Sequence, residues 1–134
     1  MPKKILIVDD EPDIRFTLGI FLESKGFVAV AAENGKAALE RLATENFDLM
    51  ILDLLMPLVD GMGVLRSMDP ELKAKLPTIV LTAKTQDEDV LQGYASGATY
   101  YMTKPFSNES ILNVVNYFIG DLDTDKRMEI ERAL

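Results

Sequence analysis

The stretch that most constrains the fold is residues 47–61, which reads FDLMILDLLMPLVDG. A short apolar run at residues 49–52 ends on the carboxylate of Asp53, and Pro57 and Gly61 follow soon after. An apolar run of this length before turn-forming residues predicts a strand buried on both faces of a sheet. A charge at the end of such a strand costs free energy unless other groups pair with it. We therefore expect other parts of the chain to supply partners for Asp53.

Short apolar runs alternate with segments of helical periodicity along the chain. We expect strands at residues 5–8, 27–31, 49–52, 78–81 and 98–102. The expected helices are residues 12–25, 37–43, 62–68 (broken by Asp69-Pro70), 87–95, and a last helix that Asn108 caps and Gly120 ends. Five strand–helix repeats predict a doubly wound α/β fold, with a parallel five-stranded sheet covered by helices on both faces.

The length of 134 residues fits one domain with a hydrophobic core. We assign residues 1–120 to this domain. Residues 121–134 are mostly charged, with a few apolar positions, and are interpreted as a polar C-terminal tail or linker with some helical character.

The composition excludes several classes of function. A net charge of -8 argues against direct binding to nucleic acid or to an anionic membrane, because both are polyanions. The chain has no cysteine and no histidine, which removes thiolate and imidazole metal sites and the Ser-His-Asp triad. The apolar run at residues 5–8 is too short for a signal peptide, and no run has the length of a membrane span. The simplest location is the cytoplasm.

Polar side chains follow four of the five expected strands. Asp9 and Asp10 follow the first strand, Asp53 ends the third, Thr82 follows the fourth and Lys104 follows the fifth. The carboxyl ends of parallel strands share one edge of a doubly wound sheet, and ligands bind there. We therefore expect three carboxylates, a hydroxyl and an ammonium to lie close together.

These groups together are suited to receive a phosphoryl group. Carboxylates held close together repel one another, and a hard cation such as Mg²⁺ relieves that repulsion. Lys104 and Thr82 add donors for phosphoryl oxygens, and a carboxylate such as Asp53 can attack phosphorus to form an acyl phosphate. Each residue taken alone has an ordinary alternative: the acidic pair is a good helix cap, Lys104 a solvated lysine and Thr82 a strand end. Their joint placement favours the functional interpretation.

The sequence resembles bacterial two-component response-regulator receiver domains, and its layout is similar to that of the chemotaxis regulator. The resemblance covers about residues 3–120. The matching motifs are Asp9-Asp10, the block at residues 53–61, Thr82-Ala83, Gly97-Ala98, Tyr101 and Lys104-Pro105-Phe106.

The resemblance implies a fold and a site. The fold is flavodoxin-like, with strand order 2-1-3-4-5 and five helices. Asp53 is the phosphoacceptor, and Thr82 and Lys104 contact the phosphoryl group. Mg²⁺ binds to Asp10 and Asp53, to Asp9 directly or through water, and to the backbone carbonyl of Leu55.

The resemblance also implies a switch. Tyr101 is the switch aromatic that turns inward as Thr82 moves toward the phosphate, whereas Tyr100 points to the other face. The Lys104-Pro105 peptide bond is cis. The face made by the fourth helix, the fifth strand and the last helix is the signalling surface.

Leu55 and Lys84 are candidates for tuning the lifetime of the phosphorylated state. They lie two residues after Asp53 and Thr82, and both flank the route by which water reaches the phosphate. Leu55 offers no group to orient an attacking water, so our hypothesis is a long-lived phosphorylated state. Lys84 has the alternative interpretation of an ordinary exposed lysine.

Three rival functions remain to be weighed. A haloacid-dehalogenase-type phosphatase needs a second aspartate two residues after its nucleophile, and Leu55 occupies that position. A flavodoxin-like electron carrier needs a hydroxyl- and glycine-rich loop after the first strand, where this chain has Asp9-Asp10-Glu11. An inactive receiver-like binding module is the third alternative. A receiver catalyses its own phosphorylation and dephosphorylation and is not a metabolic enzyme.

Several partners follow from the resemblance. The phosphodonor is a sensor histidine kinase or a histidine phosphotransfer protein. The chain shows no output domain, so it is either a stand-alone regulator that signals to a downstream protein or the receiver part of a longer one. Pairing of two copies on phosphorylation is a further expectation to test.

Overall fold

The computed structural model describes residues 2–54, 61–82 and 97–120. In chain order, the elements are β1 (Lys4–Val8), α1 (Pro12–Ser24), β2 (Val28–Ala32), α2 (Gly35–Thr44), β3 (Leu49–Asp53), α3 (Gly61–Ser67), α4 (Pro70–Lys75), β4 (Thr78–Thr82), β5 (Tyr100–Thr103) and α6 (Asn108–Ile119). The five strands form one parallel sheet in the order β2-β1-β3-β4-β5. Both the doubly wound fold and the expected strand order are confirmed.

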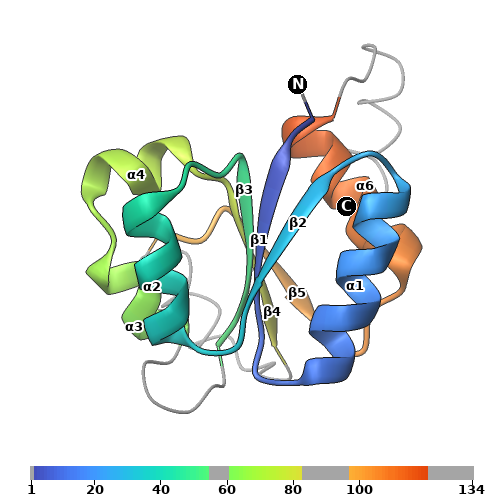
Figure 1. Ribbon diagram of the computed structural model, residues 1–134, viewed down its shortest axis with the longest axis horizontal. Coiled ribbons are helices and arrows are strands. Elements are labelled where there is room, and N and C mark those ends of the chain that lie inside the picture. Colours follow the sequence, from blue (N-terminus) through green and yellow to red (C-terminus); the bar gives the residue numbers. More distant parts are fainter. Residues whose placement is uncertain (1, 55–60, 83–96, 121–134) are drawn as a thin grey trace.

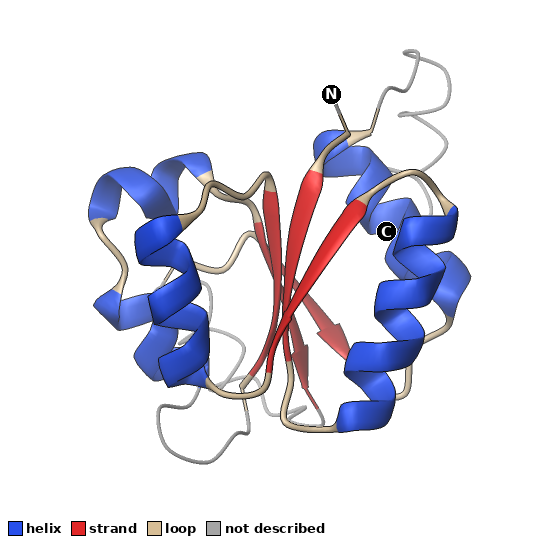
Figure 2. Ribbon diagram, viewed as in Figure 1, coloured by secondary structure: helices blue, strands red, loops and turns tan. Residues whose placement is uncertain are grey.

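The sheet is the middle of three layers. Helices α1 and α6 cover one face, and α2, α3 and α4 cover the other (Figure 1). The strands run side by side through the centre, with the helices on either side (Figure 2). Among the described residues, no helix is both long and apolar enough to cross a membrane.

The strands are apolar because both faces of the sheet are buried. In β1, Ile5 and Ile7 pack toward α1 and α6, while Leu6 and Val8 pack toward α2 and α3. Every residue of β3 is buried, as its continuous apolar run predicts. The strand that ends on Asp53 is therefore held from both sides.

Three local features follow from the residues at their positions. Asn34 caps α2 by accepting a hydrogen bond from the Ala37 N–H at 2.8 Å. Gly26 follows α1 with φ of 94°, a conformation that favours glycine. Tyr100 and Tyr101 pack against opposite faces of the sheet.

Other boundaries differ from the expectation. Asp69-Pro70 separates two helices, and the second of them, α4, was not expected. Helix α4 starts here because the Asp69 carboxylate accepts the Glu71 N–H at 2.9 Å. Ser107, and not Asn108, caps α6, through a reciprocal pair of hydrogen bonds with Ser110. The expected helix at residues 87–95 lies outside the described residues.

Two strands begin later than expected. Strand β2 starts at Val28 because the Phe27 N–H still bonds back to the Leu22 carbonyl of α1. Strand β5 starts at Tyr100 because Gly97, with φ of 116°, lies in a turn that leads into the strand. Thr99 joins this turn to β4 by exchanging hydrogen bonds with Thr78.

We expect Leu52→Ala to lower the free energy of unfolding by about 2–5 kcal/mol, because it removes a buried side chain and leaves a cavity. Leu52 has no exposed surface, whereas Phe16 is 71% exposed and serves as the control. Phe16→Ala should change stability by about 0.5 kcal/mol or less. Urea unfolding measures both, and equal effects would contradict the burial of β3.

Candidate metal centre

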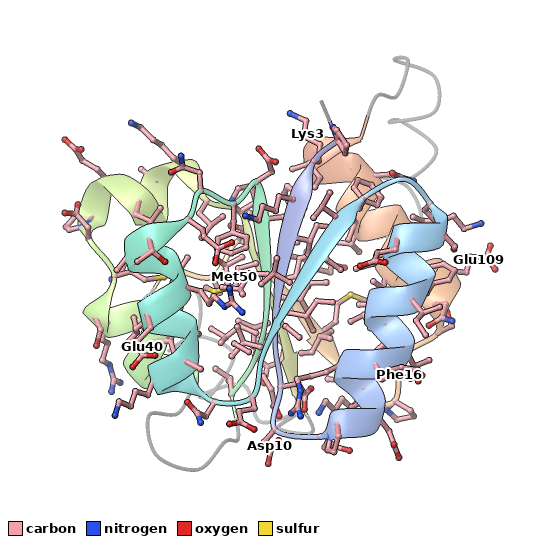
Figure 3. The ribbon with its side chains drawn as sticks, in the orientation of Figure 1. Lys3, Asp10, Phe16, Glu40, Met50 and Glu109 are labelled. Atoms are coloured by element: carbon pink, nitrogen blue, oxygen red, sulfur yellow. The ribbon has the colours of Figure 1, made fainter. Side chains whose placement is uncertain are left out.

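The strand register brings the candidate residues to one edge of the sheet. Val8 pairs with Leu52, Asp53 with Leu81, and Thr82 with Thr103. The carboxyl ends of β1, β3, β4 and β5 are therefore level, and the residues that follow them meet. Asp10 lies at this edge, beyond the end of β1 (Figure 3).

Four carboxylates gather there, one more than the three expected from the sequence. Asp9, Asp10, Glu11 and Asp53 each present an oxygen, and these oxygens all lie within 4.8 Å of one another. Asp9 and Asp53 are buried, with 2% and 3% of their surface exposed, whereas Asp10 and Glu11 are exposed. Glu11 was missed because its sequence position, at the start of a helix, has an ordinary capping interpretation.

Lys104 places its ammonium among these carboxylates. Its Nζ lies 2.9 Å from Glu11 Oε1, 3.0 Å from Asp9 Oδ2 and 3.4 Å from Asp53 Oδ2. The expectation that Lys104 and Asp53 converge is confirmed across 51 positions of sequence. The cis peptide bond between Lys104 and Pro105 is also as expected.

Asp9 is held in place by its neighbours on both sides. Its Oδ1 accepts the Glu11 backbone N–H at 2.9 Å, and its own N–H donates to the Ala32 carbonyl at 3.2 Å. The guanidinium of Arg15, one turn into α1, donates to the Asp9 carbonyl at 2.8 Å. This contact of Arg15 has no signal in the sequence, because it depends on how the turn after β1 folds back.

Burial and charge shift the ionisation of two site residues. Burial raises the pKa of the Asp9 carboxyl above its usual range, although the hydrogen bond from Glu11 and the nearby Lys104 oppose this. Burial disfavours the charged form of Lys104, but hydrogen bonds to Glu11 and Asp9 and the charge of Asp53 outweigh it, so the pKa of Lys104 is raised. Lys104 is therefore positively charged at neutral pH.

Gly61 lets the chain return close to the end of β3. A Cβ at this position would collide with the Asp53 carbonyl oxygen and lie 2.7 Å from the Leu54 Cα. The Gly61 N–H donates to the Leu54 carbonyl at 3.1 Å. The backbone that carries Asp53 is thus fixed by a contact that only glycine permits.

The donor set fits a hard divalent cation. Four carboxylates carry more negative charge than the single ammonium of Lys104 neutralises, and two of them are buried. All the candidate ligand atoms are oxygens, which Mg²⁺ prefers, and the exposed side of the cluster leaves room for water. Asp9, Asp10 and Asp53 are the residues of this edge that would hold the ion.

Of the remaining candidate residues, the structure describes Tyr101 and the backbone of Thr82. Thr82 is the last residue of β4, and Tyr101 is a half-buried residue of β5 that packs on the side of α2 and α3. The Thr82 side chain, Leu55 and Lys84 lie outside the part of the chain that the structure describes, so their expected roles remain predictions.

Comparison with known proteins gives a consistent result. Residues 5–116 match the family model of the response regulator receiver domain. The alkaline phosphatase synthesis transcriptional regulatory protein PhoP of Bacillus subtilis is 40% identical over 111 residues, which are 83% of this chain and 46% of PhoP. The response regulator SaeR of Staphylococcus aureus is 37% identical over 128 residues, 96% of this chain and 55% of SaeR. The chain spans about half the length of the curated relatives it matches.

Solved structures agree with the fold. The chemotaxis protein CheY4 of Vibrio cholerae has a TM-score of 0.83 and 30% identity, covering 89% of this chain and all of that one. The response regulator TrrA of Thermotoga maritima, solved in complex with Mg²⁺ and a beryllium fluoride, has a TM-score of 0.74 and 35% identity, covering 87% of this chain and 99% of that one.

In a buffer that chelates metals, we expect Asp9→Asn to raise the free energy of unfolding at neutral pH. The pKa of Asp9 is raised in the folded chain, so its ionised form costs stability there. Asn keeps the oxygen that accepts the Glu11 N–H and removes the charge. The advantage should shrink as pH falls through the folded pKa toward the ordinary value of 3.8, because both states of the wild type then become protonated.

Urea unfolding as a function of pH measures this difference, with Asp13→Asn as a control on an exposed carboxylate of α1. An advantage that grows as the solution is acidified would contradict the account. Adding Mg²⁺ should stabilise the wild type more than Asp9→Asn, because an ion that binds only the folded state raises its stability.

Proposed function

Because the chain belongs to the response regulator receiver domain family, we propose that it accepts a phosphoryl group from a phosphohistidine donor onto the carboxylate of Asp53, with Mg²⁺ bound beside it. The family itself establishes a receiver domain of the two-component type, which is not a metabolic enzyme. The observation that carries the proposal is the contact of the Lys104 ammonium with Asp53 inside a partly buried group of carboxylates.

The proposed reaction is a single phosphoryl transfer. A carboxylate oxygen of Asp53 forms a bond to phosphorus, and the bond from phosphorus to the donor's imidazole nitrogen breaks. That nitrogen keeps the electron pair and takes a proton from water. The product is an acyl phosphate on Asp53. Attack by water on its phosphorus later breaks the bond between phosphorus and the Asp53 oxygen, which releases inorganic phosphate and restores the carboxylate.

Residues of the chain stabilise the transfer by position and charge. Lys104 Nζ stands 3.4 Å from Asp53 Oδ2, so it is near enough to donate to phosphoryl oxygens carried on Asp53. Thr82 supplies a hydroxyl donor from the end of β4. Asp9, Asp10, Asp53 and the Leu55 carbonyl would hold Mg²⁺, which would supply positive charge to the phosphoryl oxygens.

We propose that Thr82 and Tyr101 carry the signal away from the site. Tyr101 pairs with Val80 in the sheet, so it lies on the neighbouring strand, one pair of residues back from the level of Thr82. The proposed signalling surface consists of the expected helix at residues 87–95, strand β5 and helix α6. Its partner is a downstream protein or an output domain, and two phosphorylated copies pair through it.

The phosphodonor is a sensor histidine kinase or a histidine phosphotransfer protein. An inactive receiver-like binding module is less well supported, because Lys104, Asp53 and the acidic pair are all present and converge. A phosphatase is less well supported because Leu55 replaces the second aspartate that such enzymes use.

We expect acetyl phosphate and Mg²⁺ to add one phosphoryl group to the wild type and none to Asp53→Asn, because the amide is not a nucleophile. Intact-protein mass spectrometry measures the gain, and borohydride reduction of the acyl phosphate marks the modified position. Asp13→Asn, on α1, is the control and should still be phosphorylated. Phosphorylation of Asp53→Asn at the wild-type rate would contradict the assignment.

We expect Leu55→Asn to shorten the lifetime of the phosphorylated state. An amide two residues after Asp53 can hydrogen-bond an attacking water, whereas leucine offers no such group. A Lys84→Ala variant tests the second candidate in the same way. The decay of phosphorylated protein after removal of the donor gives the rate, and an unchanged rate for Leu55→Asn would overturn the idea that Leu55 prolongs the signal.

A further inference from the structure

Glu11 has an unusual position at the start of α1. It is the N-cap residue, yet its side chain accepts no hydrogen bond from the helix it precedes. Its carboxylate instead contacts Lys104 Nζ at 2.9 Å, the shortest of the three carboxylate contacts of that ammonium. With 57% of its side chain exposed, Glu11 lies on the solvent side of the buried pair Asp9 and Asp53.

Lys104 has no donor to spare in this arrangement. An ammonium has three N–H donors, and three carboxylates lie within 3.4 Å of it. A phosphoryl group on Asp53 adds acceptor oxygens, so Lys104 must give up a partner to bind them. Asp9 belongs to the metal-binding group and is fixed by backbone hydrogen bonds. The Glu11 side chain, within the described part of the chain, is held by its contact with Lys104 alone.

We propose that Glu11 is a positioning residue that competes with the phosphoryl group for the Lys104 ammonium. This inference rests on the proposed function of Asp53 and Lys104. Before transfer, Glu11 draws Lys104 toward the solvent side of the site, and during transfer Lys104 exchanges Glu11 for a phosphoryl oxygen. Breaking the contact between Glu11 and Lys104 adds to the barrier, so weakening that contact speeds phosphorylation.

A set of three variants separates the contact from the charge. Glu11→Asp keeps the charge but shortens the side chain by one methylene, and aspartate at an N-cap turns back to its own helix. Glu11→Gln removes the charge and weakens the contact. Asp13→Asn removes a nearby exposed charge and leaves the contact between Glu11 and Lys104 intact.

We expect Glu11→Asp to raise the maximal rate of phosphorylation by acetyl phosphate with Mg²⁺ by about 1.4- to 5-fold, the range that an exposed ion pair accounts for. Glu11→Gln should raise it at least as much, and Asp13→Asn should leave the maximal rate unchanged while altering only the donor concentration for half-maximal rate. Thermal unfolding establishes that each variant is folded.

The Lys104 ammonium supplies a readout independent of the reaction. In ¹⁵N-labelled protein, its ζ protons should exchange faster with water in Glu11→Asp than in the wild type, because one hydrogen bond is lost. A wild-type maximal rate in Glu11→Asp, or unchanged ζ-proton exchange, would overturn the role of Glu11. Failure of the wild type to be phosphorylated on Asp53 would instead overturn the proposed function.

Discussion

The Lys104 ammonium lies within 3.4 Å of carboxylates from Asp9, Glu11 and Asp53, and the site depends on this arrangement. Carboxylates held so close repel one another, and two of them are buried, so one cation among four anions offsets only part of the cost. The site therefore favours the binding of a further cation, and of a ligand that accepts the hydrogen bonds of Lys104. A metal ion supplies the first need and a phosphoryl group the second.

The packing of the sheet keeps this unfavourable arrangement in place. Strands β1 and β3 are buried on both faces, so their ends are held by α1 and α6 on one side and by α2 and α3 on the other. Gly61 brings the chain against the Asp53 carbonyl, and Arg15 holds the Asp9 carbonyl. The free energy of core burial thus stabilises a site whose own electrostatics oppose folding.

The parallel sheet and the meeting point of the site residues could be predicted from the sequence. The first has a periodic signal in the sequence, and the second depends on the positions of residues relative to the strands. The alternation of apolar runs with helical segments predicts the parallel sheet. The positions of Asp9, Asp53 and Lys104 at or after strand ends predict that they meet at one edge of that sheet. The α4 helix and the Ser107 cap were missed because short polar helices depend on side-chain hydrogen bonds with little apolar periodicity. The contacts of Glu11 and Arg15 were missed because they join a turn to groups that only the folded chain brings near.

A crystal structure with Mg²⁺ and beryllofluoride tests the central claim most directly, because beryllofluoride on a carboxylate imitates a phosphoryl group. The account predicts beryllium bonded to Asp53, Mg²⁺ held by Asp53 with the acidic pair Asp9-Asp10, and Lys104 Nζ moved from Glu11 to a fluoride. Beryllofluoride bound elsewhere, or a Lys104 that stays on Glu11 beside an occupied Asp53, would contradict it.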